Sequence, residues 1–424
     1  MARADDDRVE PSHRSYGAIV RSDRPLRIIP VATISPECAV EPLGSSRIAA
    51  ALDNLRILDF SRVLAGPFAT MLLADLGAEV LKVERPEVGD ETRSWGPPFD
   101  EHGVATYFQA VNRNKRSIAL DLTESGDVAR ARALALESDV VIENFRPGLL
   151  DALGLGYDEL RRGRPSIIFC SITGFGRGAG AELPGYDLLV QALGGLMSIT
   201  GTPEGEPQKV GVALVDVLAG LFATVGILAA VHHRDRGGEG QRIDIDLLSS
   251  LLAALVNQGS AYTIAGVVGA RMGNEHPSIA PYALFDAADS ALVIAIGNDR
   301  QFAALCDVLG VPELAASEAY ADNEQRVHNR GALRAALERP LARRPAAEWA
   351  HELTAARVPA GAVNDLAGAF ALAESLGLEP IVEVPREDGG SVPLTRNPIG
   401  MSASPPTYRS APPPLARREA EEPA

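Results

Sequence analysis

The alternation of short apolar runs with helix-like stretches constrains the fold of this chain more than any other feature. Between Leu55 and Thr173, runs such as LRILDF and DVVIE alternate with segments of helical periodicity. Strands separated by helices in this way predict a parallel, doubly wound sheet. Ligands of such sheets bind at the carboxyl ends of the strands. We predict strands at 55–60, 78–84, 117–120, 139–143 and 166–173, with helices at 66–76 and 122–136.

The second half of the chain predicts long helices and then a smaller α+β domain. Residues 209–231 and 244–264 have the composition of long helices. A strand pair at 282–285 and 291–296 follows, and helices begin at Asp299, Gln325, Ala346 and Asp365. We expect the small domain to span 276–360, before a last hairpin at 379–384 and 391–394. Residues 1–50 are predicted to be a disordered extension, or to result from a start codon placed too far upstream. Residues 401–424 are predicted to form a loose tail.

Charge and cysteine content limit the class of function. The chain of 424 residues has 40 Lys and Arg against 56 Asp and Glu, a net charge of −16. This acidity argues against broad binding to nucleic acids or to anionic membranes. Three separated cysteines, at 38, 170 and 306, favour a reduced, cytoplasmic setting. The longest apolar segment, 210–231, contains Asp216 and Gly220, and we interpret it as a buried helix.

Asp216 is the one carboxylate in that apolar segment. It fits a helix N-cap, since Asp is a preferred capping residue. It also fits a nucleophile, because a poorly solvated carboxylate is reactive and helix N–H groups can hold charged products. Other motifs compete poorly: there is no HExxH, G-x-S-x-G or P-loop, and no metal site is expected. The GFGRGAG run lacks the third glycine and the helix of a dinucleotide loop. The remaining candidates for base or nucleophile are Glu143, Asp187, Asp216 and Glu275.

Basic side chains gather in two loops near the predicted strand ends. In an acidic protein such a group suits phosphate recognition or, equally, a solvated face. The cations are Arg85, Arg93, Arg113, Lys115 and Arg116. After the strand at 139–143, Asn144 and Phe145 suit a planar ring such as adenine, although NFRPG is also ordinary loop sequence.

Several of these stretches together resemble the class III CoA-transferases. They include FSRVLAGPFATMLLADLGAEVLKVERPEVGDETRSW, NRNKRSIALDL, DVVIENFRPGLLDALGLGYDEL and the segment around Asp216, in register from 52 to 398. The resemblance is to the formyl-CoA and carnitine CoA-transferase group, which shares its fold with α-methylacyl-CoA racemase. It implies coenzyme A as the ligand and an interlocked homodimer. It also implies a Rossmann-like large domain over 51–235, completed by 361–400, with linker helices and an active-site loop at 236–275.

The resemblance assigns roles to individual residues. Asp216 matches the nucleophile, which would form an aspartyl mixed anhydride and then an aspartyl-CoA thioester. Trp95 matches an aromatic residue beside a mobile active-site loop, which here is Gly273, Asn274, Glu275 and His276. The positions that match the CoA site are Val63, Ala65, Arg85, Leu120, Asn144 and Phe145.

Local departures from the family pattern favour one branch and one substrate class. The racemases have His before the Asp of a G-H-D motif, where this chain has Tyr186 before Asp187, and a phenol is a poor α-proton shuttle. We therefore predict a transferase, with a racemase or a non-catalytic CoA-binding protein as alternatives. Leu64 stands where formyl-CoA transferase has Gln, and Glu275 would repel a small carboxylate. We expect Arg62 to pair with the distal carboxylate of a dicarboxylic acyl group such as succinyl.

Overall fold

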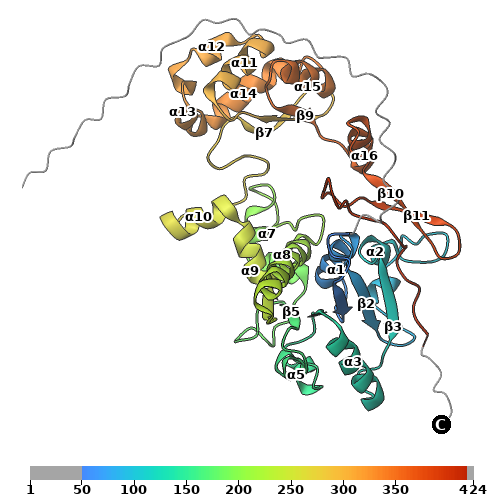
Figure 1. Cartoon of the computed structure of the whole chain (residues 1–424). Helices are drawn as coiled ribbons and strands as arrows, with labels where there is room; N and C mark the ends of the chain where they lie inside the picture. Colours follow the sequence, from blue (N-terminus) through green and yellow to red (C-terminus); the bar gives the residue numbers. More distant parts are fainter. Residues whose placement is uncertain (1–49, 418–424) are drawn as a thin grey trace, which may run out of the picture. The chain divides into compact units, whose positions relative to one another are not determined.

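The computed structural model describes residues 50–417, and the larger of its domains is built on a six-stranded parallel sheet (Figure 1). The strand order is β3-β2-β1-β4-β5-β6, so the chain reverses direction across the sheet between β1 and β4. The predicted extension at 1–50 lies outside the described residues, except for Ala50. The strands are β1 (Arg56–Asp59), β2 (Glu79–Glu84), β3 (Lys115–Ala119), β4 (Val140–Glu143), β5 (Ile168–Thr173) and β6 (Arg242–Asp246).

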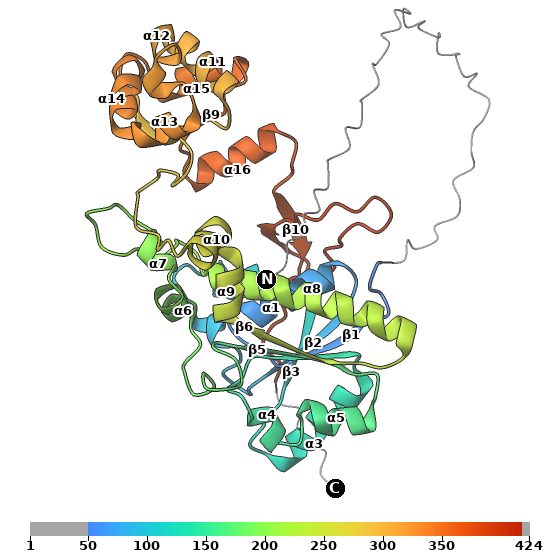
Figure 2. The ribbon, with the colours of Figure 1, turned by 90° about the vertical axis from the view of Figure 1, so that its left-hand side faces the viewer.

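Helices cover both faces of this sheet (Figure 2). The strands β4 and β5 are wholly buried, which explains why they read as continuous apolar runs. One face packs on α1 (Ala65–Asp75), α8 (Leu214–Gly237) and α9 (Leu247–Ala254). The other packs on α3 (Ser125–Glu137), α4 (Leu149–Ala152) and α5 (Tyr157–Gly163). The prediction of a parallel sheet with helices on both sides is confirmed.

The long helix α8 is a core element. It is long and apolar enough to cross a membrane by length and composition alone. Its packing against α1, α9 and the sheet gives it a buried side within the fold. Gly220 permits the closest approach, since a Cβ atom there would lie 2.6 Å from the Ala65 carbonyl oxygen. We therefore keep the interpretation of α8 as a core helix.

The prediction of one helix over 244–264 is wrong at its start. Arg242–Asp246 pairs with β5 as the edge strand β6, and the helix is split into α9 and α10 (Val256–Ala265). The alternating sequence RIDID suits a strand once a sheet edge is available to pair with it. Asp246 then caps α9 by accepting a hydrogen bond from the Ser249 N–H.

The small domain has its own three-stranded antiparallel sheet, β7 (Tyr282–Asp286), β8 (Ala291–Ala295) and β9 (Ala360–Ala362). A separate core, which includes Phe302 and Trp349, fills the space between this sheet and its helices. Because β9 pairs with β8, the sheet extends two residues past the predicted boundary at 360. The helices are α11 (Asp299–Leu309), α12 (Pro312–Ala315), η2 (Glu318–Tyr320), α13 (Asn323–His328), α14 (Arg330–Leu341) and α15 (Ala346–Ala355).

The C-terminal segment returns to the large domain. After α16 (Leu366–Ser375), β10 (Ile381–Pro385) and β11 (Ser391–Thr395) form a hairpin that pairs only with itself among the described strands. The prediction of a loose tail is wrong for 407–413, whose main chain forms hydrogen bonds with the large domain. Arg409 donates hydrogen bonds to the carbonyl oxygens of Ala74, Gly77 and Ala78 at the end of α1. Because these carbonyl groups lie at and just after the end of α1, Arg409 fastens this part of the C-terminal segment to the large domain.

Candidate active site

A cavity of about 380 Å³ lies where the sheet reverses its strand order. The loops that follow β1 and β4 line one part of it, and residues 172–176 and 180–186 line another. This is the position at which doubly wound sheets bind ligands. The cavity brings together nine of the residues singled out from the sequence: Arg62, Val63, Leu64, Ala65, Trp95, Asn144, Phe145, Tyr186 and Asp216.

Asp216 lies in the first turn of α8 and is partly buried at the edge of this cavity. Among residues 50–417, no hydrogen bond or ion pair is formed by its carboxylate. Burial, and then the nearby charge of Asp187, raises the pKa of Asp216 to about 7. A carboxylate that is poorly solvated and unpaired keeps reactive oxygens, as a nucleophile requires.

The alternative interpretation of Asp216 as the helix cap is wrong. The first residue before α8 is Ala213, which has no capping side chain. Asp187, at the start of α6 (Asp187–Leu193), instead accepts hydrogen bonds from the N–H groups of Val215 and Asp216, at 2.8 and 3.3 Å. A residue from another helix thus fills the capping role, and Asp216 is left free for chemistry.

A close backbone contact holds the segment before α6 against the end of β5. A Cβ atom on Gly174 would lie 2.4 Å from the Gly185 Cα, and one on Gly185 would lie 2.7 Å from the Gly174 Cα. Only glycine at both positions permits this contact between the end of β5 and the residue before Tyr186. The glycine-rich run that resembles a dinucleotide loop therefore serves, at Gly174, to bring Tyr186 and Asp187 to the site.

The loop between β1 and α1 is held in a strained shape at the cavity. Val63 has a φ of +69°, which is unfavourable for a β-branched residue. Its N–H donates to Asp90, and Asp90 forms a 2.9 Å ion pair with the fully buried Lys82. Asn144 holds the preceding residue through two hydrogen bonds to the main chain of Arg62, at 2.8 and 2.7 Å. The role of Asn144 in binding adenine stays a prediction. Its two hydrogen bonds to Arg62 show that it holds the shape of this loop.

Arg62 presents a cation to the same cavity. One of its terminal nitrogens lies 2.6 Å from Glu91, in η1 (Glu91–Ser94), and the guanidinium lies 5.0 Å from the centre of the Phe145 ring. Its Nε is buried with no hydrogen-bond partner among the described residues. Glu91 was not singled out from the sequence, because one acid in an acidic loop carries no local signal. The pair leaves donor capacity on Arg62 for a further acidic group.

Comparisons with known protein sequences identify the family and several relatives of this chain. The model of CoA-transferase family III matches residues 52–418. This chain belongs to CoA-transferase family III. The succinate–glutarate CoA-transferase of Agrobacterium fabrum is 43% identical over 87% of the chain and 94% of its own length. The acetyl-CoA:oxalate CoA-transferase of Acetobacter aceti is 41% identical over 82% of the chain and 89% of its own length.

A solved structure supports the fold. The crystal structure of a CaiB/BaiF family protein from Brucella suis has a TM-score of 0.77 and 43% identity, covering 87% of this chain and 97% of that one. The family and its relatives confirm the prediction of a CoA-transferase.

Two of the residues predicted to bind phosphate in this CoA-transferase instead form buried ion pairs. Arg113 is buried and forms a 2.6 Å ion pair with Asp75, and Lys115 is buried 3.3 Å from Asp59. Burial lowers the pKa of Lys115 to about 8. Their prediction as CoA-binding cations is corrected, since both side chains are buried in ion pairs and neither lines the Asp216 cavity. Leu120 is likewise a fully buried core residue.

Arg85 and Arg116 remain exposed but do not line the Asp216 cavity. Arg85 lies 3.9 Å from Glu91 and, with residues 415–417 of the C-terminal segment, lines a separate cavity. Arg93 is engaged by Glu84 at 2.7 Å. Of the five cations considered together in the sequence, only Arg85 and Arg116 are as exposed as phosphate binding requires.

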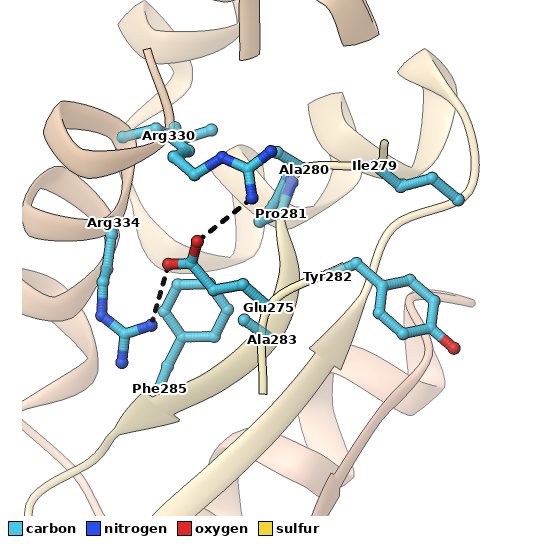
Figure 3. A pocket seen from close by; sticks show the side chains of 10 residues that line it. Glu275, Ile279, Ala280, Pro281, Tyr282, Ala283, Phe285, Arg330 and Arg334 are labelled. Carbon is cyan, nitrogen blue, oxygen red and sulfur yellow. Dashed lines mark hydrogen bonds and ion pairs between the residues drawn. The ribbon is translucent and has the colours of Figure 1, made fainter. Parts of the chain in front are cut away.

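The predicted active-site loop of the transferase lies by the small domain. Glu275 forms ion pairs with Arg330 and Arg334 of α14, at 3.2 and 3.7 Å (Figure 3). His276 stacks at a tilt on Tyr282, with ring centroids 5.3 Å apart. Gly273, Asn274 and Glu275 line a cavity of about 390 Å³ that does not include Asp216. Trp95, by contrast, lines the Asp216 cavity and packs edge-on against Tyr107, which lies in α2 (Thr106–Ala110).

Proposed function

We propose that this enzyme moves CoA from a dicarboxylic acyl-CoA thioester to a free dicarboxylic acid, with Asp216 as the nucleophile. The observation that carries the proposal is that Arg62, whose Nε has no hydrogen-bond partner among the described residues, and the unpaired carboxylate of Asp216 line the same cavity. Relatives named as succinyl-CoA:glutarate and succinyl-CoA:mesaconate CoA-transferases, 43% identical to this chain, support the substrate class.

The proposed reaction keeps the energy of the thioester in covalent bonds. An Asp216 oxygen attacks the thioester carbonyl, the C–S bond breaks, and an acyl-aspartyl anhydride and CoA thiolate form. The thiolate attacks the aspartyl carbonyl, which releases the donor carboxylate and leaves aspartyl-CoA. The acceptor carboxylate attacks this thioester to form a second anhydride and free thiolate. The thiolate then takes the new acyl group, and the Asp216 carboxylate is restored.

The substrate class is tested with the purified enzyme and pooled acceptors. We expect new acyl-CoA masses from succinyl-CoA with dicarboxylic acids of four to six carbons, and little exchange with acetyl-CoA or with monocarboxylic acids of matched length. The reason is that Arg62 can pair with a second carboxylate. Equal turnover of acetyl-CoA and succinyl-CoA would contradict the proposed substrate class, while leaving the transferase activity itself intact.

Replacing Arg62 by methionine tests the role of that cation. We expect kcat/KM for succinyl-CoA to fall about 10- to 100-fold, because a charge-assisted hydrogen bond contributes about 1.5–3 kcal/mol. The value for a monocarboxylic donor should change little, and this comparison within one variant is the control. Losses of equal size for both donors would assign Arg62 to shaping the loop instead.

Exposed apolar surfaces support the proposal of a homodimer. Large side chains are exposed on α8, α10 and α16, and surfaces of this kind mark contact with a protein partner. They include Leu221, Phe222, Val225, Tyr262, Ile264, Leu366, Leu372 and Leu376. We expect a dimer mass by sedimentation velocity and a monomer for Val225→Glu. A monomeric wild-type enzyme at micromolar concentration would overturn this part of the proposal.

A further inference from the structure

We propose that Asp187 is a positioning residue for CoA transfer, which holds the first turn of α8 and denies Asp216 the hydrogen-bond donors of its own helix end. The inference rests on the proposed role of Asp216 as nucleophile. It adds a second carboxylate whose function is to keep the first one reactive.

The carboxylate of Asp187 is fully engaged. Its Oδ1 accepts from the N–H groups of Val215 and Asp216, at 2.8 and 3.3 Å. Its Oδ2 accepts from Gln191 Nε2 at 2.6 Å. Gln191 is buried, and its own Oε1 accepts from the N–H of Val210 at 2.9 Å. Residues of α6 therefore hold both the segment that leads into α8 and its first turn.

This arrangement removes the ordinary stabilisation of an anion at a helix start. Free N–H groups and the helix dipole normally favour negative charge there, and Asp216 stands in the first turn. Because Asp187 occupies two of those donors and brings its own charge, the field at Asp216 is less favourable to the carboxylate. A less stabilised carboxylate is a stronger nucleophile. The weaker stabilisation of the ionised Asp216 in the resting enzyme therefore favours its attack on the thioester.

The groups that act on Asp216 come from several elements. Asp187 faces it from α6. Tyr107 in α2 is also nearby: burial, and then the charges of Asp216 and Asp187, raise the pKa of Tyr107. Arg62 and Glu91 line the same cavity as an ion pair. Burial and Asp187 are the causes of the high pKa of Asp216. Removal of the Asp187 charge should therefore act on this carboxylate in particular.

Asp187→Asn removes the charge and keeps the two bonds to α8, since the Asn Oδ1 can accept from the same N–H groups, although its amide nitrogen cannot accept the bond from Gln191 Nε2. Asp216 must be ionised to attack, so the wild-type exchange rate should rise with pH through about 7. In the variant we expect this limb to move about one unit lower, so that at pH 6 the enzyme reaches about a fivefold larger fraction of its plateau. The plateau itself should fall several-fold, because the carboxylate is less basic.

Controls separate positioning from folding and from the proposed function. Asp187→Ala should lose the cap, with a lower thermal midpoint and at least a tenfold lower plateau. Asp187→Ser, which can cap without charge, repeats the pH test if Asp187→Asn does not fold. An unchanged pH profile in a folded variant that still forms an Asp216 adduct would overturn this inference alone. No Asp216 adduct in the wild type would instead overturn the proposed function.

Discussion

Asp216→Ala should lower CoA exchange at least about 1,000-fold, because loss of a covalent nucleophile removes the whole two-step route. Asp216 is partly buried at the edge of a cavity, and Asp187 still caps the helix in the variant, so the fold should persist. Binding of CoA, measured by calorimetry, should change less than tenfold. The measurement is transfer of CoA from succinyl-CoA to an acceptor acid, followed by mass spectrometry.

A second aspartate on the same helix provides the control. Asp235 is exposed near the other end of α8 and forms an ion pair with Arg234. Asp235→Ala should leave exchange within about twofold, because exposed ion pairs contribute little. Hydroxylamine added to wild-type enzyme and acyl-CoA should yield a hydroxamate at Asp216 and none at Asp235. An Asp216→Ala enzyme within tenfold of the wild type would refute the nucleophile assignment.

Arg113→Met should destabilise the fold by about 3–5 kcal/mol, because it strands the buried Asp75 carboxylate without its charged partner. Asp75 accepts from Arg113 at 2.6 Å, and also from Asn114 and Asn397 at 2.7 and 3.1 Å. These contacts tie the end of α1 to β3 and to the C-terminal segment. The loss is measured as a shift of the urea unfolding midpoint and slope.

Arg116 provides the matched control for this prediction. It lies three residues away, is exposed on β3, and was considered with Arg113 as a phosphate-binding residue. Arg116→Met should change stability by less than about 0.5 kcal/mol. CoA affinity of the folded Arg113→Met enzyme should stay close to that of the wild type. A stable Arg113→Met enzyme with weakened CoA binding would restore the original assignment of Arg113.

Part of the candidate site follows from the strands, which the local sequence predicts well, whereas their order in the sheet came from the structure. Val63 and Asn144 are far apart in the chain and lie around one cavity because β1 and β4 are neighbours at the reversal point of the sheet, and Asp216 joins them from α8. Parallel strands end at the same edge, so recognising the strands is enough to bring their loops together. The family resemblance identified the same residues independently.

The fate of the charged residues was harder to predict. Arg113, Lys115 and Arg116 are nearly consecutive, yet two of them are buried in ion pairs and one is exposed. Alternation along β3 and the positions of Asp75 and Asp59 decide this, and neither is visible in the composition of the loop. Glu91 and Asp187 present the same difficulty, since their partners Arg62 and Val215 lie about thirty residues away.

By itself the sequence determined the class of fold, the family and the carboxylate at the start of α8, because periodicity and ordered motifs are local properties of the chain. The tertiary structure decided which aspartate caps that helix, which cations stay accessible, and that residues 407–413 bind to the large domain. Those outcomes depend on which donors and acceptors meet after folding. A buried polar group without a partner raises the free energy of the folded state, so each such pairing matters.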